Sequence, residues 1–376
     1  MTGNYHKIGD YISVIDNRNT DGSITKLMGI SIDKCYIPSV ANVIGTDLSN
    51  YKVIRRGQFA CSLMQVSRDQ RIPIAMYEDD APAIMSPAYV MFEVSRPDVM
   101  LPDYMALWFK RAEFDREASF YAVGGVRGSL DWEDFCKMEL PDPPLPEQQK
   151  IVRDYQVITE RIELLRKMND KLIEAGTLLF TSFFDNSSEE CSDVPLYDIA
   201  GYINGTSFSE DEYANNGLPI IKIAELKDGI TAATQYFVGE KDEKFFIENG
   251  DVLFSWSGNP ETSIDAFIWT HGNGILNQHT FKMVCPHGKA FTFFMLKYCK
   301  PDFIKAAQGK QTTGLGHVTV QDLKRLTLHF SPEIAKEFND QGTPIFDVIY
   351  RNLQEINLLN SMKSQLLVSL SRSKGA

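Results

Sequence analysis

Residues 147–184 read EQQKIVRDYQVITERIELLRKMNDKLIEAGTLLFTSFF, a proline-free stretch in which apolar residues recur at alternating steps of four and three. The seam positions are Ile151, Tyr155, Ile158, Ile162, Leu165, Asn169, Leu172, Gly176, Leu179 and Phe183. This heptad pattern predicts a helix that keeps one stripe against a partner helix. At 1.5 Å per residue the helix is roughly 57 Å long, which is more than one compact domain of average helices needs.

A second stretch of the same kind closes the chain. Its seam positions are Phe346, Ile349, Leu353, Ile356, Asn360, Lys363, Leu367 and Leu370. The seam asparagines Asn169 and Asn360 lower stability and can fix the register of paired helices. Near the start of the stretch stands Pro344, and we expect it to interrupt the helix. Either stretch alone could be an ordinary core helix, but two of them half a chain apart favour a packed pair.

Composition places the chain among ordinary globular proteins. The 376 residues suffice for two or three domains, and no apolar run approaches the roughly 20 residues of a membrane span. The N-terminus has no signal-peptide pattern, so we expect a cytoplasmic protein without a membrane partner. The six cysteines are scattered and are expected to be small buried hydrophobes. The net charge of −12 counts against strong autonomous binding of nucleic acid.

The two halves of the chain share one layout at an offset of roughly 190 residues. Residues 53–62 resemble 246–255, and residues 104–110 resemble 294–300. In each half, short strands precede one helix candidate, which is expected at 102–114 and at 291–307. The expected strands are 11–15, 58–63, 72–76 and 89–94, then 219–223, 251–256, 266–269 and 280–285. The sequence therefore predicts an α+β domain followed by a long helix, twice over.

Four regions follow from this layout. We expect similar domains at residues 1–145 and 186–330, and long helices at residues 146–185 and 331–376. Two long amphipathic helices bury their seams most economically against each other. Repeat symmetry with the two domains far apart then requires an antiparallel coiled-coil pair, which predicts a pseudo-two-fold dumbbell.

The order of several motifs resembles the specificity subunit of type I restriction–modification systems. The motifs are PDPPLPEQQKIV at 141–152, LLFTSFF at 178–184, LPIIKI at 218–223, IENGDVLFSWS at 247–257 and the C-terminal stretch from Pro344 to Leu370. The resemblance covers nearly the whole chain, and its specificity comes from the shared order of the motifs.

This resemblance implies a function without catalysis in the chain itself. The two domains would be target-recognition domains, each reading one half of a bipartite, asymmetric site in double-stranded DNA. The helices would act as a spacer and as the docking surface for two methyltransferase subunits, which carry the cofactor S-adenosylmethionine. A motor–nuclease subunit can join such complexes in restriction and defence. The alternative is a coiled-coil scaffold that binds proteins only, without DNA readout.

Catalytic and metal motifs do not assemble in this sequence. The Asp142-Pro143-Pro144-Leu145 stretch resembles the loop of amino-methyltransferases, but leucine offers no face for stacking a flipped base. No phosphate-binding loop of the form GxxxxGK[ST] occurs, and the histidines have no metal-ligand spacing. We therefore expect no catalytic residue, no metal and no cofactor in this chain.

Two glycine-rich loops in matching places are the best candidates for DNA contact. Arginine and lysine suit guanine, glutamine suits adenine, and threonine serves base edges or phosphates. The expected contacts are Gly125, Arg127 and Ser129 in the first loop and Lys310, Gln311, Thr312, Thr313 and His317 in the second. Secondary candidates are Arg68, Arg71, Ser257 and Asn259. For each loop the alternative is a solvated turn without a partner.

Overall fold

The computed structural model describes residues 5–39, 45–64, 66–123, 128–185, 191–310 and 315–370. These residues form two compact units. Unit 1 comprises residues up to Glu160 together with residues from Asn360 onward, and unit 2 comprises Arg161–Leu359. The two long helices α5 (Leu145–Phe184) and α12 (Pro332–Ser369) contribute to both units.

Unit 1 contains a four-stranded antiparallel sheet with the order β2–β9–β6–β7. Its strands are β2 (Ile12–Ile15), β6 (Phe59–Cys61), β7 (Ile74–Met76) and β9 (Val90–Val94). The remaining strands pair in twos: β1 (Tyr5–Lys7) with β10 (Glu139–Pro141), β3 (Met28–Ile30) with β4 (Tyr36–Pro38), and β5 (Lys52–Ile54) with β8 (Ala83–Met85). The helices are α1 (Val66–Asp69), α2 (Pro102–Phe109), α3 (Ala112–Tyr121) and α4 (Trp132–Lys137).

Unit 2 repeats this plan, with the sheet order β12–β21–β17–β19. The four strands are β12 (Gly201–Asn204), β17 (Val252–Ser255), β19 (Asp265–Ile268) and β21 (Thr280–Val284). The pair β11 (Ser192–Pro195) and β23 (Thr327–Phe330) corresponds to β1 and β10 of unit 1. The helices are α6 (Leu196–Ile199), α7 (Ile223–Asp228), α8 (Pro260–Ser263), α9 (Lys289–Tyr298), α10 (Lys300–Gln308) and α11 (Val320–Arg325). The predicted duplication is therefore confirmed in the topology of the strands.

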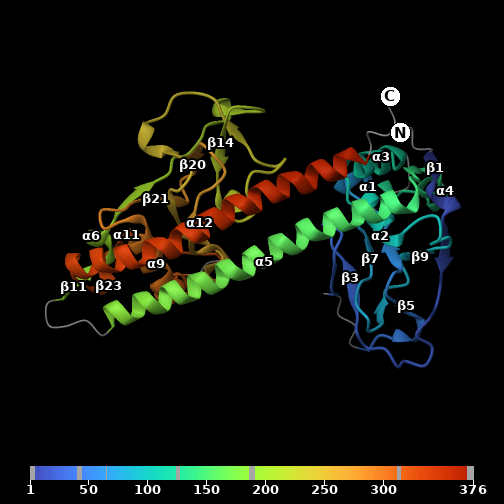
Figure 1. The fold of residues 1–376 in the computed structure, drawn as a ribbon, viewed down its shortest axis with the longest axis horizontal. Helices are drawn as coiled ribbons and strands as arrows, with labels where there is room; N and C mark the ends of the chain where they lie inside the picture. Colours follow the sequence, from blue (N-terminus) through green and yellow to red (C-terminus); the bar gives the residue numbers. More distant parts are fainter. Residues whose placement is uncertain are drawn as a thin grey trace. The chain divides into compact units, whose positions relative to one another are not determined.

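Unit 2 has a further five-stranded sheet with the order β13–β15–β14–β20–β16. Its strands are β13 (Tyr213–Ala214), β14 (Leu218–Ile221), β15 (Tyr236–Phe237), β16 (Phe246–Ile247) and β20 (Gly274–Leu276). Figure 1 shows β14 and β20 side by side in this part of the unit, and their pairing is parallel. A short pair, β18 (Ser257–Gly258) with β22 (Gly316–His317), completes the strands.

The eight predicted strands are all present, with ends that differ from the prediction by at most two residues. The two helix candidates were wrong in one respect, because each is two helices. The break falls at Lys110–Arg111 in unit 1 and at Cys299 in unit 2. In unit 2 the cause is Pro301, which lies in the first turn of α10, where its missing N–H is not needed.

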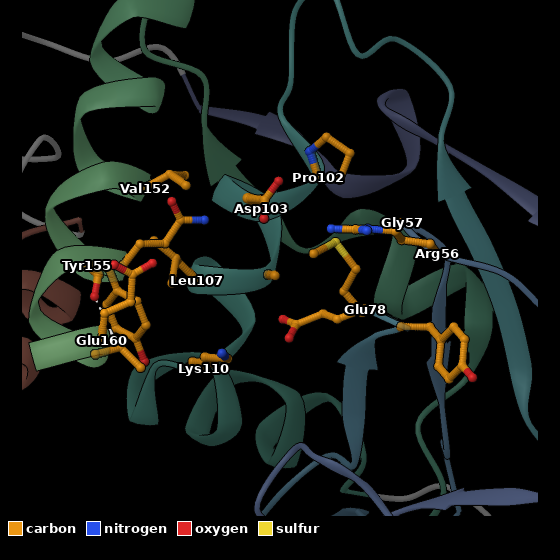
Figure 2. Close-up of a pocket in the computed structure, with 15 residues that line it drawn as sticks. Arg56, Gly57, Glu78, Pro102, Asp103, Leu107, Lys110, Val152, Tyr155 and Glu160 are labelled. Atoms are coloured by element: carbon orange, nitrogen blue, oxygen red, sulfur yellow. Dashed lines mark hydrogen bonds between the residues drawn. The ribbon is translucent and has the colours of Figure 1, made fainter. Parts of the chain in front are cut away.

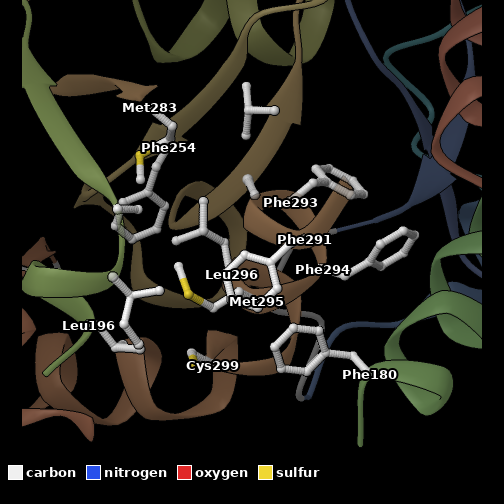
Figure 3. Packing of buried hydrophobic residues seen from close by; sticks show 14 of the residues in the cluster. Phe180, Leu196, Phe254, Met283, Phe291, Phe293, Phe294, Met295, Leu296 and Cys299 are labelled. Atoms are coloured by element: carbon white, nitrogen blue, oxygen red, sulfur yellow. The ribbon is translucent and has the colours of Figure 1, made fainter. Parts of the chain in front are cut away.

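Aromatic side chains dominate the core of unit 2. Phe180 of α5 is fully buried and stacks on Phe184, with ring centroids 4.3 Å apart. Phe180 also meets Phe338 of α12 edge-to-face and Phe291 of α9 at a tilt. Figure 3 shows Phe180 beside the α9 residues, with Phe254 and Met283 of the sheet beyond them. The long helices are thus part of the domain core and are not merely attached to it.

The predicted seam of α5 is confirmed, since all ten of its positions are buried or half-buried. Within unit 2, α5 and α12 run antiparallel, as the contacts Arg161–Glu355 and Asn169–Asn352 show. Asn352 Nδ2 donates to Asn169 Oδ1 at 2.8 Å, and both side chains are buried. The expectation that Asn360 is the second seam asparagine was wrong: Asn360 is exposed, and Asn352 is the buried partner.

The expected interruption at Pro344 does not occur, because α12 continues through it. The turns on both sides are held by tertiary packing, with Phe338 before the proline and Phe346 and Ile349 after it all buried in the core of unit 2. Thr343 Oγ1 donates to the carbonyl of Asn339 at 2.6 Å. Packing on both sides outweighs the lost backbone hydrogen bond.

Near the start of each long helix, an amide side chain hydrogen-bonds to the N-terminus of a core helix. Gln148 of α5 accepts from the backbone N–H of Leu101, directly before α2. Asn339 of α12 accepts from the backbone N–H of Phe291, in the first turn of α9. Both amides satisfy donors at a helix N-terminus that the helix itself cannot pair. The first turns of α5 and α12 are thereby fixed relative to the core helices of their units.

Candidate nucleic-acid interface

Five of the predicted contact residues, Gly125, Arg127, Gln311, Thr312 and Thr313, lie outside the described residues. The segments that flank them are described, and they show how each glycine-rich loop is anchored. In unit 1 the backbone N–H of Leu130 donates to the carbonyl of Leu63 at 2.9 Å. In unit 2 the backbone N–H of Val318 donates to the carbonyl of Trp256 at 2.8 Å. The two loops therefore return to equivalent positions after the equivalent strands β6 and β17.

The structure brings two of the predicted residues of unit 2 together. Ser257 of β18 lies opposite His317 of β22, and Gly258 lies opposite Gly316. Gly258 has a φ of +113°, and a Cβ there would lie 2.8 Å from the Cβ of Ser263. Only glycine fits this approach without displacing α8. The residues were predicted from two separate stretches of sequence, and the β18–β22 pair places them side by side.

Asn259 has a structural task at the same place. Its Oδ1 accepts from the backbone N–H groups of Glu261 and Thr262 at 3.1 and 3.2 Å, which caps α8. The capping fixes the orientation of the amide, with the carbonyl oxygen turned to the helix. Its NH₂ group is then the part of the side chain that can donate to a ligand.

Lys310 is held within the protein. Its Nζ forms an ion pair with Asp322 and donates to Thr319 Oγ1 at 3.2 Å. Burial by itself would raise the pKa of Asp322, but the hydrogen bonds from Lys310 and Thr319 outweigh burial and lower that pKa. Asp322 is 2 % exposed, and Thr319 with Asp322 forms a capping box at the start of α11. Lys310 thus fastens the loop to α11, which leaves its charge largely neutralised.

The three predicted residues of unit 1 that the structure describes, Arg68, Arg71 and Ser129, lie at or near α1. Gly128 has a φ of +73°, and a Cβ there would lie 2.2 Å from Ser67 Oγ, so the loop that leads to Ser129 passes directly over α1. Arg68 of α1 is exposed and pairs with Asp69 at 2.7 Å. Arg71 pairs with Asp33 at 3.0 Å. Both guanidinium groups are at the surface, where such ion pairs exchange readily for phosphate contacts.

Sequence reasoning missed the role of three exposed side chains beside Trp256. The indole Nε1 donates to Asn204 Oδ1 at 3.1 Å, and the Trp256 and His279 rings lie 5.7 Å apart. Gln278 Nε2 is 3.5 Å from His279 Nε2. Asn204 and His279 come from strand ends that are distant in sequence and meet only through the register of β12, β21 and β17. No local pattern in the sequence marks such a meeting.

A separate cavity of about 440 Å³ lies within unit 1 between α2, β7 and the first turns of α5. Figure 2 shows Val152, Tyr155 and Glu160 of α5 on one side, with Arg56 and Gly57 on the other. None of the predicted DNA-contact residues lines it. Burial raises the pKa of Tyr155 to about 12, and its ring lies under the ammonium groups of two lysines, Lys110 and Lys363, at 5.5 and 5.2 Å.

The described part of the chain shows neither a cluster of metal ligands nor a membrane-spanning helix. Within the described ranges no three His, Cys, Asp or Glu side chains gather closely enough to hold a metal ion. No helix in those ranges is long and apolar enough to cross a bilayer. Asp142, which begins the stretch that resembles a methyltransferase loop, accepts a hydrogen bond from the Tyr11 hydroxyl at 2.7 Å.

The comparisons with known proteins find likenesses to one kind of protein. Residues 188–357 match the family described as type I restriction modification DNA specificity domain. A curated relative, the type I restriction enzyme MjaIX specificity subunit of Methanocaldococcus jannaschii, is 22% identical over 302 residues, which are 73% of this chain and 69% of the relative. The crystal structure of the type I restriction–modification S subunit from M. genitalium superposes with a TM-score of 0.53 at 12% identity, covering 98% of this chain and 96% of the other.

Proposed function

We propose that this chain, as a member of the family of type I restriction–modification specificity subunits, supplies DNA sequence recognition to a methyltransferase complex. Residues 1–145 and 186–330 are the two target-recognition domains in this proposal. Each reads one half of a bipartite, asymmetric site in double-stranded DNA. In this proposal the protein acts in the cytoplasm, together with the DNA that it reads.

The observation that carries the proposal is the repetition of one sheet with one anchored loop. The orders β2–β9–β6–β7 and β12–β21–β17–β19 correspond strand by strand, and the segment after each glycine-rich loop bonds to a carbonyl within two residues of the end of β6 or β17. A duplicated domain with different surface residues suits a site made of two unlike halves. A scaffold that binds proteins only has no need for this correspondence.

The chain contributes recognition, and its partners contribute chemistry. In the proposal, residues 146–185 and 331–376 form the helical spacer and the docking surface for two methyltransferase subunits, which bind S-adenosylmethionine. A restriction subunit with motor and nuclease activity can complete the assembly. The acidic balance of the chain agrees with a subunit that binds DNA firmly only when its partners close around the duplex.

The test combines the purified chain with its methyltransferase partner. Modified bases are mapped in host DNA with and without the gene for this chain. We expect methylation at one bipartite motif only when the chain is present, and no methyl transfer by the chain alone. Methylation by the purified chain without a partner would contradict the proposal. Unchanged methylation in a strain that lacks the chain would favour the scaffold.

Variants of the interface refine the test. Arg127→Ala and His317→Ala are expected to weaken binding or relax one half of the motif, while Lys244→Ala serves as an exposed control outside both loops. Lys310→Ala is less informative, because it also removes the partner of the buried Asp322. A shift assay with the partner present measures all four variants under one salt concentration.

A further inference from the structure

Six residues from four segments of unit 2 lie at one end of its four-stranded sheet. They are Asn204, Trp256, Ser257, Gln278, His279 and His317, and we name this surface the β18 edge. The register Ser255↔Thr280 puts His279 beside Trp256, and the pair Ser257↔His317 adds β22. Asn204, Gln278, His279 and His317 are exposed, while Trp256 is half-buried.

The β18 edge offers amide and imidazole hydrogen-bond donors. The indole N–H of Trp256 occupies Asn204 Oδ1, so the NH₂ group of Asn204 is the part left to face a ligand. Gln278 Nε2 and the ring N–H groups of His279 and His317 are further donors. No lysine or arginine belongs to the edge, and the adjacent Lys310 is held by Asp322 and Thr319. Side-chain amides and imidazoles at this density suit base edges better than phosphates.

The acceptors that such donors match in the major groove are N7 of both purines, O6 of guanine and O4 of thymine, and three of these four lie on purines. Two aromatic rings, Trp256 and His279, lie within the edge at a centroid distance of 5.7 Å. Trp256 acts as a positioning residue, because its N–H decides which end of the Asn204 amide points outward.

The equivalent edge of unit 1 has different chemistry. The anchoring bonds Leu130–Leu63 and Val318–Trp256, together with the strand registers, align the two units residue by residue. The β18-edge residues Asn204, Trp256, Ser257, His279 and His317 thereby correspond to Asp16, Leu63, Met64, Ala88 and Ser129 of unit 1. Met64 is 58% exposed, and Asp16 is paired with Arg18 at 2.7 Å. Only Ser129 offers a neutral donor among these five positions.

We propose that the β18 edge reads the N7 and O6 acceptors of purines in the half-site bound by unit 2, and that the other half-site is recognised without an equivalent set of donors. This inference rests on the proposed function and names the base atoms that one of its two domains contacts. The two halves of the DNA site are therefore distinguished by different chemistry on equivalent edges.

The experiment uses the complex of this chain with its methyltransferase partner and a duplex that carries the mapped motif. Each purine is replaced in turn by its 7-deaza analogue, which keeps base pairing but lacks the N7 acceptor. Binding is measured for wild type and for Gln278→Ala/His279→Ala. Met64→Ala/Ala88→Ser at the equivalent edge of unit 1 is the matched control.

In the wild-type complex, we expect 7-deaza substitution in one half-site to weaken binding about tenfold for each contacted purine. That penalty disappears in Gln278→Ala/His279→Ala and persists in the control. Trp256→Phe, which keeps a ring but removes the N–H, is expected to lose part of the 7-deaza penalty. Gln278→Ala/His279→Asn, which has a donor where Gln278→Ala/His279→Ala has none, is expected to keep part of the penalty. Circular dichroism and thermal unfolding confirm that each variant folds.

Equal 7-deaza penalties in wild type and Gln278→Ala/His279→Ala would overturn the inference while leaving the proposed function intact. Equal penalties in both half-sites of the wild-type complex would do the same. A wild-type complex without preference for any DNA sequence would instead contradict the proposed function, and the inference with it. A variant that fails to fold is replaced by the single change Gln278→Ala, whose side chain is exposed.

Discussion

The buried amide pair Asn169–Asn352 gives a quantitative test of how α5 and α12 are held together in unit 2. Asn352 Nδ2 donates to Asn169 Oδ1 at 2.8 Å, and the side chains are 5% and 8% exposed. Asn169 Nδ2 has no hydrogen-bond partner within the described structure. Asn352→Ala would leave the whole Asn169 amide buried and unpaired.

The expected cost follows from the physics of buried polar groups. Losing the partner of one buried amide destabilises by about 1–3 kcal/mol. The double change Asn169→Leu/Asn352→Leu removes both amides and adds apolar surface beside Leu165, Ile349 and Ile356, which are all buried. The double variant should therefore be as stable as the wild type or more stable, whereas the single variant is less stable.

Hydrogen exchange of peptides that cover residues 162–176 and 346–358 measures the local opening free energy. The single variant should exchange about 5- to 150-fold faster, which is the same 1–3 kcal/mol expressed as a rate ratio. Asn360→Ala on the exposed face of α12 is the matched control and should leave the exchange rates unchanged. Protection in Asn352→Ala equal to that of wild type, or lower protection in the double-leucine variant than in the single one, would refute the reasoning.

Three further outcomes follow from the cores and the pKa shifts. Phe180→Ala should destabilise unit 2 by about 3–5 kcal/mol, measured by urea unfolding, because its fully buried ring contacts the aromatic core; a loss under 1 kcal/mol would contradict the packing described. Ending the chain after Gln365 removes three leucines that pack in unit 1, so exchange should rise in β6 and β9 but not in β17 and β21. Because the pKa of Asp322 is lowered in the folded state, its carboxylate stabilises the fold above the unfolded pKa of about 4. This stabilisation is lost as the pH falls through the folded pKa. Asp322→Asn should remove this acid-side loss in a pH series of thermal unfolding, and an unchanged profile would argue against the Lys310 pair.

Elements with a strongly periodic sequence were predictable from the sequence. Features that depend on packing between distant segments were not. The seam of α5 and eight of the strands were found because alternation and heptad spacing are local properties. The two-residue strand β18 contains too few residues to show a period. The continuity of α12 through Pro344 depends on Phe338, Phe346 and Ile349 of the surrounding core, which no local rule includes.

The candidate interface divides in the same way. Composition and glycine content indicated the two loops, and the structure placed Ser257 beside His317. The approach of Asn204 to Trp256 depends on strand register across 52 residues of chain, which the sequence does not display. Lys310 looked like a free cation in the sequence, yet the buried Asp322 is its partner. Charge counting therefore overestimates the basic groups that can reach phosphate.

The completion of unit 1 by Leu366, Leu367 and Leu370 has a consequence for biosynthesis. These leucines leave the ribosome after all of unit 2, although their packing partners Val152 and Tyr155 were translated more than two hundred residues earlier. The nascent chain must therefore keep part of its first core open until unit 2 has been synthesised. Unit 2, formed by one uninterrupted segment, can fold while synthesis of the tail is still in progress, so the second domain of the polypeptide is expected to reach its native state before the first.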